Sequence, residues 1–367
     1  MKSIVVFRSA ALGDFVMTVP ALKILREVYP GRRIIFLTIQ TTEKKTQRLV
    51  ASYAGGHNSV PWVNLVMPHL VDDVVVMHSV FSWAEIKLVR QRLTGINVEL
   101  CVLMLDPCAP WFGRLKKLIL LSLILRGVPL YGWRGPGSLN GDRARLKMQG
   151  VLRHHVHGPL QFLSELSPPR LYKDAELCFD LRPGTPAEAW AKSWLAQYGL
   201  LGKRLVAFAP GALQAHKQWP LDAFKGLLRH LLYEYPEIAV LIMGAPKDTQ
   251  LGIELCSQAP DRVFNVTGFS SISQSAALFQ HVHLLVGNDG GAIHLGDAMG
   301  CKVVSIVPGI EYPDSIEPWH NKDLAIRLSI ECAPCYSFTF CPLAHQRCMR
   351  DISVDAVLKK CRSVLKK

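Results

Sequence analysis

One segment of the chain, from Leu285 to Leu295, combines residue types that can bind a phosphate group. Its sequence is LVGNDGGAIHL, which is typical of a buried strand, a glycine turn and the start of a helix. Unpaired N–H groups and the positive dipole end at a helix N-terminus attract anions, and adjacent glycines let a diphosphate approach the backbone. The same pattern occurs in α/β domains without a ligand, where Asp289 would be an N-cap and His294 a core residue. The segment alone therefore leaves two interpretations open.

A second loop carries a cation suited to such a site. It follows the apolar run 205–209 and contains Gly211 and Lys217 ahead of the helix entry Trp219-Pro220. Carboxyl ends of parallel strands meet at one edge of a sheet, so we expect Lys217 to face the Asp289 turn and to neutralise a phosphate. The alternative is a solvated surface lysine. Trp219 is expected to pack rather than to catalyse.

A carboxylate follows the first apolar run of the chain. Asp14 lies in the loop between residues 4–7 and the helical pattern around Pro20. One interpretation is a helix N-cap that accepts backbone N–H bonds, and the other is a general base for a substrate hydroxyl.

The candidate residues Asp14, Lys217 and Asp289 each follow an apolar run, and such runs alternate with helical patterns along the chain. The predicted strands are 4–7, 34–39, 74–77 and 100–105 in the first half, and 205–209, 239–243, 284–286 and 302–307 in the second. Buried runs separated by helices predict parallel sheets of βαβ units with right-handed crossovers. We therefore expect two doubly wound domains, with a boundary near the Pro- and Gly-rich stretch 166–184 and a ligand cleft between the domains.

Length and composition agree with a two-domain globular protein. The chain has 367 residues, of which 49% are hydrophobic, and it has no low-complexity tail. The start, Met1-Lys2-Ser3, lacks the pattern of a signal peptide, so a cytoplasmic location is expected. No segment approaches the ~20 apolar residues of a membrane span.

Positive charge is concentrated in the first half. Residues 1–165 hold 21 Lys and Arg against 10 Asp and Glu, which is +11 of the formal net charge of +13. The stretch 134–157 alone contributes five basic residues and three histidines: Arg134, Arg143, Arg145, Lys147, Arg153, His154, His155 and His157. This pattern suits an anionic acceptor. Solubility is the plain alternative, and nucleic acid is disfavoured because no nucleic-acid-binding motif accompanies the charge. Lys116, Lys117 and Arg126 bracket an apolar run that could rest on an anionic membrane surface or be a core helix.

Ten cysteines in a cytoplasmic chain argue against a disulfide framework. Five are expected to pack in or beside apolar segments: Cys101, Cys108, Cys178, Cys256 and Cys301. Four others, Cys332, Cys335, Cys341 and Cys348, form a cluster that also contains His345. Thiolates and an imidazole over a short loop could hold zinc or iron, although the second pair is spaced more widely than CxxC and free thiols remain the alternative.

Taken together, these motifs resemble glycosyltransferase family 9, the ADP-heptose:lipopolysaccharide heptosyltransferases. The resemblance rests on the motifs around Asp14, Gly211 with Lys217, and residues 287–295, which occur in the family's order along nearly the whole chain. It implies an α/β GT-B fold with an acceptor-binding domain (residues 1–170), a nucleotide-sugar domain (171–350) and a final helix (351–367) that packs back on the first domain.

The resemblance also implies roles for individual residues. Asp14 is then the base, while the diphosphate of the donor is bound by Lys217 and by residues of the glycine turn, namely Asp289, Gly290, Gly291 and His294, with Gly211 nearby. Lys217 also assists catalysis by stabilising charge on the leaving diphosphate. The resemblance implies a reaction that inverts the anomeric centre without a metal. A nucleoside diphosphate leaves as an anion, so one carboxylate is enough for the reaction. In the related autotransporter heptosyltransferases a comparable cysteine finger holds iron, which makes a structural Fe or Zn at the four cysteines plausible.

Two positions depart from the family pattern. Gly290 often corresponds to Ser or Thr, so a hydroxyl contact to phosphate is missing here. Asp297 stands where a small apolar residue is expected, and it brings a negative charge near an anionic ligand unless it faces away.

The sequence therefore predicts heptose transfer from ADP-heptose to the anionic inner core of lipopolysaccharide, with peripheral contact to the cytoplasmic face of the inner membrane and no nucleic acid partner. The alternatives are heptosylation of an autotransporter protein and a nucleotide-sugar- or metal-binding protein without turnover.

Overall fold

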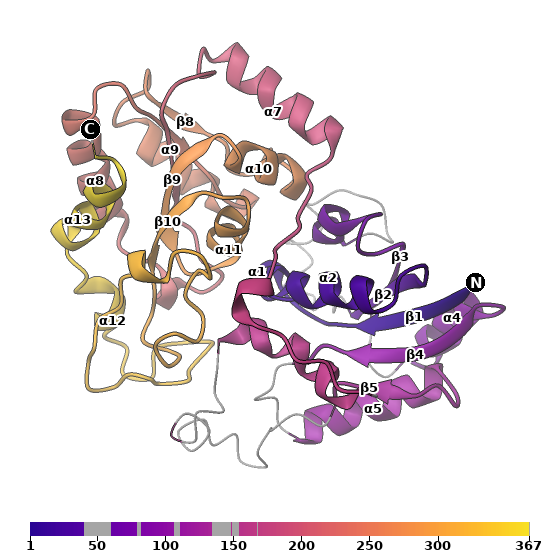
Figure 1. The fold of residues 1–367 in the computed structure, drawn as a ribbon. Coiled ribbons are helices and arrows are strands. Elements are labelled where there is room, and N and C mark those ends of the chain that lie inside the picture. Colours follow the sequence, from indigo (N-terminus) through magenta and orange to yellow (C-terminus); the bar gives the residue numbers. More distant parts are fainter. Residues whose placement is uncertain are drawn as a thin grey trace. The chain divides into compact units, whose positions relative to one another are not determined.

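The chain forms two compact units, residues 1–181 and 182–367 (Figure 1). A computed structural model describes residues 1–39, 60–78, 82–105, 111–133, 148, 154–166 and 168–366. The division falls beside Arg182-Pro183-Gly184, at the C-terminal end of the stretch in which the sequence places the boundary.

The first unit is built on a five-stranded parallel sheet. Its strands are β1 (Lys2–Phe7), β2 (Arg33–Ile39), β3 (Asp73–Met77), β4 (Asn97–Leu103) and β5 (Leu130–Tyr131), in the order β3-β2-β1-β4-β5. The central strand β1 is buried from Ser3 to Phe7, as expected for a strand covered on both faces. The predicted strands of this half are confirmed; β5, with two residues, is too short for its hydrophobic pattern to be recognised.

Helices and a short 3-10 turn connect these strands, and three further 3-10 turns follow β5. The helices are α1 (Leu12–Val16), α2 (Val19–Val28), α4 (Trp83–Leu93) and α5 (Trp111–Ile124), and the turns are η1 (Pro61–Val66), η2 (His155–His157), η3 (Pro159–Glu165) and η4 (Asp174–Glu176). Helix α4 begins where the Ser82 hydroxyl accepts a hydrogen bond from the backbone N–H of Glu85. No helix in the described ranges is long and apolar enough to cross a membrane.

The second unit repeats the scheme. Its strands are β6 (Leu205–Ala209), β7 (Ala239–Ile242), β8 (Val263–Asn265), β9 (Val282–Asn288) and β10 (Lys302–Ile306), all parallel and in the order β10-β9-β6-β7-β8. The predicted strands again correspond to observed ones. Strand β8 was not predicted, because three residues are too few for a recognisable hydrophobic pattern. Strand β9 runs two residues past the predicted end at Val286, so that Asn288 becomes part of the sheet edge.

Helices of this unit cover the sheet (Figure 1). They are α7 (Thr185–Gln197), α8 (Leu221–Glu234), α9 (Thr249–Cys256), α10 (Ile272–Phe279), α11 (Gly291–Ala298), α12 (Arg347–Arg350) and α13 (Val354–Val364), with turns η5 (Ala215–Lys217), η6 (Pro246–Asp248) and η7 (Lys322–Leu324). Helix α13 packs against α8 and β10, and Leu358 and Cys361 belong to the same core as β6 and β9. A return of residues 351–367 to the first unit, as the family resemblance implies, stays a prediction.

Both sheets reverse their strand order next to their first strand. In the first unit the reversal lies between β1 and β4, and in the second between β6 and β9. Neighbouring loops diverge above such a switch point and leave room for a ligand at the carboxyl ends of the strands. Asp14 follows β1, Lys217 follows β6 and Asp289 follows β9, so the predicted site residues come after the strands that flank each switch point.

Candidate functional site

The glycine turn of the second unit has the predicted strand–turn–helix form. Strand β9 ends at Asn288 and α11 begins at Gly291. Gly287 allows β9 to approach β6 closely, since a Cβ there would lie 2.5 Å from the carbonyl oxygen of Ala209. Gly290 is the N-cap residue of α11 in extended backbone conformation, and a Cβ there would meet nothing nearer than the Asn288 carbonyl at 3.8 Å. The backbone N–H groups at the start of α11 thus remain accessible for an anion.

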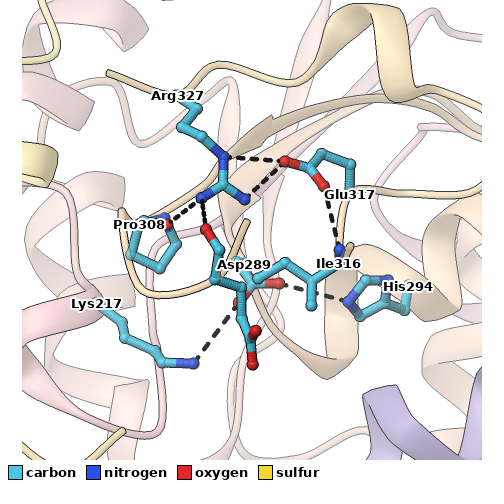
Figure 2. Close-up of polar contacts among 8 residues, drawn as sticks. Lys217, Asp289, His294, Pro308, Ile316, Glu317 and Arg327 are labelled. Carbon is cyan, nitrogen blue, oxygen red and sulfur yellow. Dashed lines mark hydrogen bonds and ion pairs between the residues drawn. The ribbon is translucent and has the colours of Figure 1, made fainter. Parts of the chain in front are cut away.

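Three side chains converge at this turn (Figure 2). Lys217 Nζ lies 3.7 Å from one carboxylate oxygen of Asp289, and His294 Nε2 lies 3.4 Å from the other. Asp289 and His294 are buried, and Lys217 is largely so. The structure therefore brings together Lys217, Asp289 and His294, as the sequence predicts, and excludes the interpretations of Lys217 as a solvated lysine and Asp289 as an N-cap.

The Asp289 carboxylate is held in its charged form. Burial alone would raise its pKa, but the hydrogen bond from His294 and the charges of His294, Lys217 and Arg327 outweigh burial and hold the pKa below its ordinary range. A charged Asp289 orients Lys217 and His294 beside the N-terminus of α11. The group can therefore present a fixed cation and backbone donors to an anionic ligand.

A buried asparagine ties the two loops of this cluster together. Asn288 Oδ1 accepts a hydrogen bond from the backbone N–H of Trp219 (2.9 Å), and its Nδ2 donates to the carbonyl of Pro210 (2.7 Å). Trp219 packs in the core against Phe224 and donates from Nε1 to the Ile352 carbonyl, which confirms its predicted structural role. Sequence reasoning missed Asn288, whose position directly before the Asp289 turn was the available signal.

An arginine organises the loop that follows β10. Arg327 makes an ion pair with Glu317 through Nε and Nη2, at 3.0 and 2.7 Å, and donates from Nη1 to the carbonyls of Pro308 and Glu311 (Figure 2). Both partners of the ion pair are largely buried. Arg327 thus fixes residues 308–317 and adds positive potential near Asp289. No motif in the sequence points to Arg327, because only the tertiary structure places this residue beside β10.

Gly211 permits a close approach between two loops of the second unit. A Cβ at Gly211 would lie 2.3 Å from the carboxyl carbon of Asp248, which is buried and accepts a hydrogen bond from the Ala245 N–H. Burial raises the pKa of Asp248, while the Ala245 hydrogen bond and the Lys247 charge act in the opposite direction. The requirement for glycine at 211 is therefore steric, and a contact to the donor stays a prediction.

In the first unit, Asp14 lies in the first turn of α1 and is exposed. The N-cap residue of α1 is Ala11, without a side-chain cap, so the interpretation of Asp14 as an N-cap is wrong. Among the described residues none forms a hydrogen bond or ion pair with its carboxylate, while its backbone carbonyl accepts from the Thr18 hydroxyl (2.8 Å). Asp14 is thus available to a ligand at the carboxyl end of β1.

Asp297 is occupied by partners of its own. Its carboxylate accepts from the backbone N–H of His320 and from Asn321 Nδ2 (2.7 Å), and it pairs with His320 Nδ1 at 3.0 Å. These contacts set Asp297 apart from the Lys217–Asp289–His294 cluster.

The four clustered cysteines line one cavity of about 290 Å³. Cys332 Sγ lies 3.8 Å from His345 Nε2. Burial raises the pKa of Cys348, the backbone of Gly309 lowers it, and the other three thiols of the cluster raise it further. Within the described residues, no three His, Cys, Asp or Glu side chains are close enough together to hold a metal ion.

Another imidazole reaches the same cavity. His216, next to Lys217 in η5, is buried and lines the cavity with the cysteines. Burial lowers its pKa, with a smaller opposing contribution from the backbone of Ser337. His216 was not predicted from the sequence, although it is the residue directly before Lys217.

The remaining cysteine and charge predictions have mixed outcomes. Cys101 and Cys301 are buried and Cys256 packs against the core, as predicted, whereas Cys178 is exposed and the prediction for it is wrong. Cys108 lies outside the described residues, as do Arg134, Arg143, Arg145, Lys147 and Arg153. Of the histidines in that stretch, His157 contacts Tyr172 and lies 3.7 Å from Asp174.

Comparisons with known proteins identify the family of the chain. A family model described as glycosyltransferase family 9 (heptosyltransferase) matches residues 120–342. Lipooligosaccharide heptosyltransferase 2 of Campylobacter jejuni subsp. jejuni serotype O:2 is 27% identical over 174 residues, which are 45% of this chain and 52% of that protein. The match thus spans about half the length of that relative.

Solved structures show the same fold over nearly the whole chain. The E. coli ADP-heptose LPS heptosyltransferase II superimposes with a TM-score of 0.65 at 18% identity, covering 99% of this chain and 98% of that one. The iron-containing dodecameric glycosyltransferase TibC from enterotoxigenic E. coli gives a TM-score of 0.55 at 13% identity, covering 99% of this chain and 75% of that one. The predicted GT-B class, with two Rossmann-like units, is confirmed, and the chain belongs to glycosyltransferase family 9.

Proposed function

We propose that this protein transfers heptose from ADP-heptose to the anionic inner core of lipopolysaccharide, with inversion and without a metal in the transfer step. The observation that carries the proposal is the buried Lys217–Asp289–His294 cluster at the N-terminus of α11, above the switch point of the second sheet. Family membership and the E. coli relative named for ADP-heptose support this donor.

The cluster suits the departure of a diphosphate. As the bond to the sugar breaks, negative charge grows on the leaving phosphate, and preorganised donors aimed at that charge lower the barrier. Lys217 supplies a fixed ammonium, and the first backbone N–H groups of α11 supply dipoles. Asp289 keeps the lysine in place without leaving the site anionic, because Lys217 and His294 flank its charge.

Asp14 is proposed as the base that takes the proton from the acceptor hydroxyl. Its carboxylate is exposed at the carboxyl end of β1 and has no partner among the described residues that would compete with a substrate. A nucleoside diphosphate needs no proton to leave, so a second carboxylate of the kind that glycosidases use is unnecessary.

The first unit also has a surface suited to an anionic lipid layer. Helix α5 exposes Trp111, Phe112, Leu115 and Ile119, whose spacing places them on one helix face. Lys116 on α5 and Arg126, just after the end of the helix, are exposed cations. Apolar side chains bordered by cations match the interface of an anionic bilayer, so we infer peripheral contact through α5 on the cytoplasmic side of the inner membrane.

The proposal is tested with purified protein and a panel of donors and acceptors. ADP-heptose and several UDP-sugars are each combined with deacylated lipopolysaccharide inner core, and separately with an autotransporter protein, and nucleotide release and product mass are measured. We expect ADP release that depends on ADP-heptose and on the inner core. Activity with UDP-sugars alone would refute the donor, modification of the autotransporter alone would refute the acceptor, and absence of transfer would favour a non-catalytic binding protein.

Variants then test the assigned roles. Asp14→Asn and Lys217→Ala should each lower kcat by 10²-fold or more, on the order expected for a general base or an electrostatic donor. Asp222→Asn and Lys203→Ala change exposed side chains of the same types in the second unit and serve as matched controls. Equal turnover in Lys217→Ala would remove that residue from the mechanism.

A further inference from the structure

The buried ion pair between Arg327 and Glu317 has no role in the transfer as proposed above. Its side chains are 13% and 6% exposed, so both charges have been removed from water. Desolvation of two ions is costly, and apolar residues of similar volume often stabilise a protein as well as a buried ion pair does. Stability alone is therefore a weak reason for this pair, and its place near Asp289 points to an electrostatic role.

The backbone brings Arg327 to the sheet edge that carries Asp289. Its neighbour Ile326 forms a parallel bridge with Ile306, the last residue of β10, and accepts a hydrogen bond from the Val307 N–H at 2.8 Å. The carbonyl of Ile306 in turn accepts a hydrogen bond from the Asp289 N–H at 3.0 Å. Arg327 and Asp289 are thus both tied through their backbones to the carboxyl end of β10.

The guanidinium of Arg327 uses all three of its nitrogens. Nε and Nη2 donate to Oε1 of Glu317, and Nη1 donates to the carbonyls of Pro308 and Glu311 (Figure 2). The other carboxylate oxygen of Glu317 accepts a hydrogen bond from the Ile316 N–H at 3.1 Å. The two side chains thus hold both ends of the loop after β10, and the rigid fork of a guanidinium suits several acceptors at once.

The charge of Arg327 also reaches Asp289. Burial raises the pKa of Asp289, whereas His294, Lys217 and Arg327 each lower it. Charges in a buried site interact over several ångströms, because the surroundings screen them weakly. Part of the counter-charge for Asp289 therefore comes from Arg327, which leaves more of the positive charge of Lys217 available to an anionic ligand.

We propose that Arg327 is a positioning residue of the donor site, whose guanidinium holds the loop after β10 and offsets the charge of Asp289, so that Lys217 is free to bind the diphosphate. Glu317 orients the guanidinium. Arg327 acts through Asp289 and the loop and need not touch the ligand. The inference rests on the proposed function, because it concerns the diphosphate of a nucleotide donor.

Neutralising the two partners one at a time should affect ADP binding in different ways. Arg327→Gln leaves the negative charge of Glu317 unpaired near the site and should weaken ADP binding roughly 10-fold or more. Glu317→Gln keeps an oxygen for Arg327, loses the bond from the Ile316 N–H and leaves the positive charge, so ADP should bind at least as tightly as to the wild type. Isothermal titration calorimetry with ADP measures both. A pair with a purely structural role would lower the affinity in both variants.

A conservative variant separates the charge of Arg327 from its geometry. Arg327→Lys keeps the positive charge but loses the fork that holds the carbonyls of the loop. It should therefore melt at a lower temperature than the wild type and still bind ADP more tightly than Arg327→Gln does. Equal ADP affinities of Arg327→Lys and Arg327→Gln, with both variants folded, would overturn the electrostatic role.

The second unit offers a matched control pair at its surface. Arg362 Nε donates to Glu234 Oε2 at 2.8 Å and joins α13 to α8, and the arginine is half-exposed. Arg362→Gln and Glu234→Gln make the same chemical changes as the test variants, and both should bind ADP as the wild type does. Thermal unfolding and far-UV circular dichroism verify that every variant is folded before its affinity is compared.

Donor kinetics distinguish failure of this inference from failure of the proposed function. With ADP-heptose, Arg327→Gln should raise the donor KM and lower kcat, with a smaller change in the acceptor KM. Transfer by the wild type together with equal losses in Arg327→Gln and Glu317→Gln would overturn the role of Arg327 and leave the function intact. ADP affinities that follow the charge without any transfer would refute heptosyl transfer and leave the role of Arg327 standing. A wild-type protein that does not bind ADP would refute both.

Discussion

At the scale of single residues, Asp289 shows how a buried carboxylate can serve an anion site. Its charge holds Lys217 Nζ at 3.7 Å and His294 Nε2 at 3.4 Å. The favourable pairing depends on ionisation, and the pKa of Asp289 is held below its ordinary range despite burial. The carboxylate therefore positions Lys217 and His294, and the ammonium of Lys217 offsets its negative charge.

This pairing predicts a pH dependence of stability. Because the folded pKa of Asp289 lies below the unfolded one, its stabilisation is complete above the unfolded value of about 4 and disappears as the pH falls through the folded value. Asp289→Asn should lower the free energy of unfolding by about 3 kcal/mol at pH 7 and by progressively less below about pH 4. Urea unfolding across this pH range measures the difference. A difference that stays constant with pH would contradict the ionic pairing, and Asp222→Asn is the exposed control.

Gly290 allows a second prediction at this scale. Because a Cβ there meets no atom closer than 3.8 Å, Gly290→Thr should fold normally and place a hydroxyl at the N-cap of α11. One added hydrogen bond to the donor phosphate, worth about 1 kcal/mol, should lower the KM for ADP-heptose roughly fivefold. Steady-state kinetics and thermal unfolding check this.

Gly287 provides the matched comparison for Gly290. A side chain there would collide with the Ala209 carbonyl at 2.5 Å, so Gly287→Ser should destabilise the protein strongly. Equal losses of stability at both glycines would mean that the space at Gly290 is not open.

At the scale of elements, the loops after β6, β9 and β10 lie next to one another because these three strands are neighbours in the sheet. Asn288 joins the first two loops, and Arg327 with Glu317 fixes the third. These contacts explain how loops without regular structure hold a cluster in place: buried polar side chains satisfy their backbone groups. The site is thus carried by the sheet edge and its buried polar network.

Helix α5 carries the prediction for the membrane. Changing Trp111, Phe112 and Ile119 together to Ser removes most of its exposed apolar surface and should weaken binding to anionic vesicles by 10-fold or more, because that surface contributes the insertion energy. Cosedimentation with phosphatidylglycerol-containing vesicles measures binding. Transfer to deacylated acceptor should be unaffected.

Two controls define that experiment. Tyr233→Ser removes a highly exposed aromatic residue from α8 in the second unit and should bind vesicles as wild type does. Neutral phosphatidylcholine vesicles should bind the wild-type protein weakly, since each cation near an anionic surface contributes about 1 kcal/mol. Vesicle binding by the triple variant at wild-type strength would exclude α5 as the contact.

At the scale of the whole molecule, the repeated βαβ pattern was readable because parallel strands buried on both faces are continuous apolar runs. Such runs identified the main strands of both sheets and, through them, the loops that carry Asp14, Lys217 and Asp289. The strands β5 and β8 were missed because two or three residues carry no recognisable period. The distribution of charge could also be counted from the sequence, and most of the excess positive charge lies in residues 1–165.

The sequence by itself thus determined the class of fold, the family and the glycine turn with its lysine, because these depend on local residue types and on spacing along the chain. Tertiary structure alone decided which side chains meet. It paired Arg327 with Glu317, directed Asp297 to His320 and Asn321, and placed His216 in a cavity with cysteines more than one hundred residues away. Those outcomes depend on strand order and on the burial of polar atoms, and neither is encoded in any short stretch of sequence.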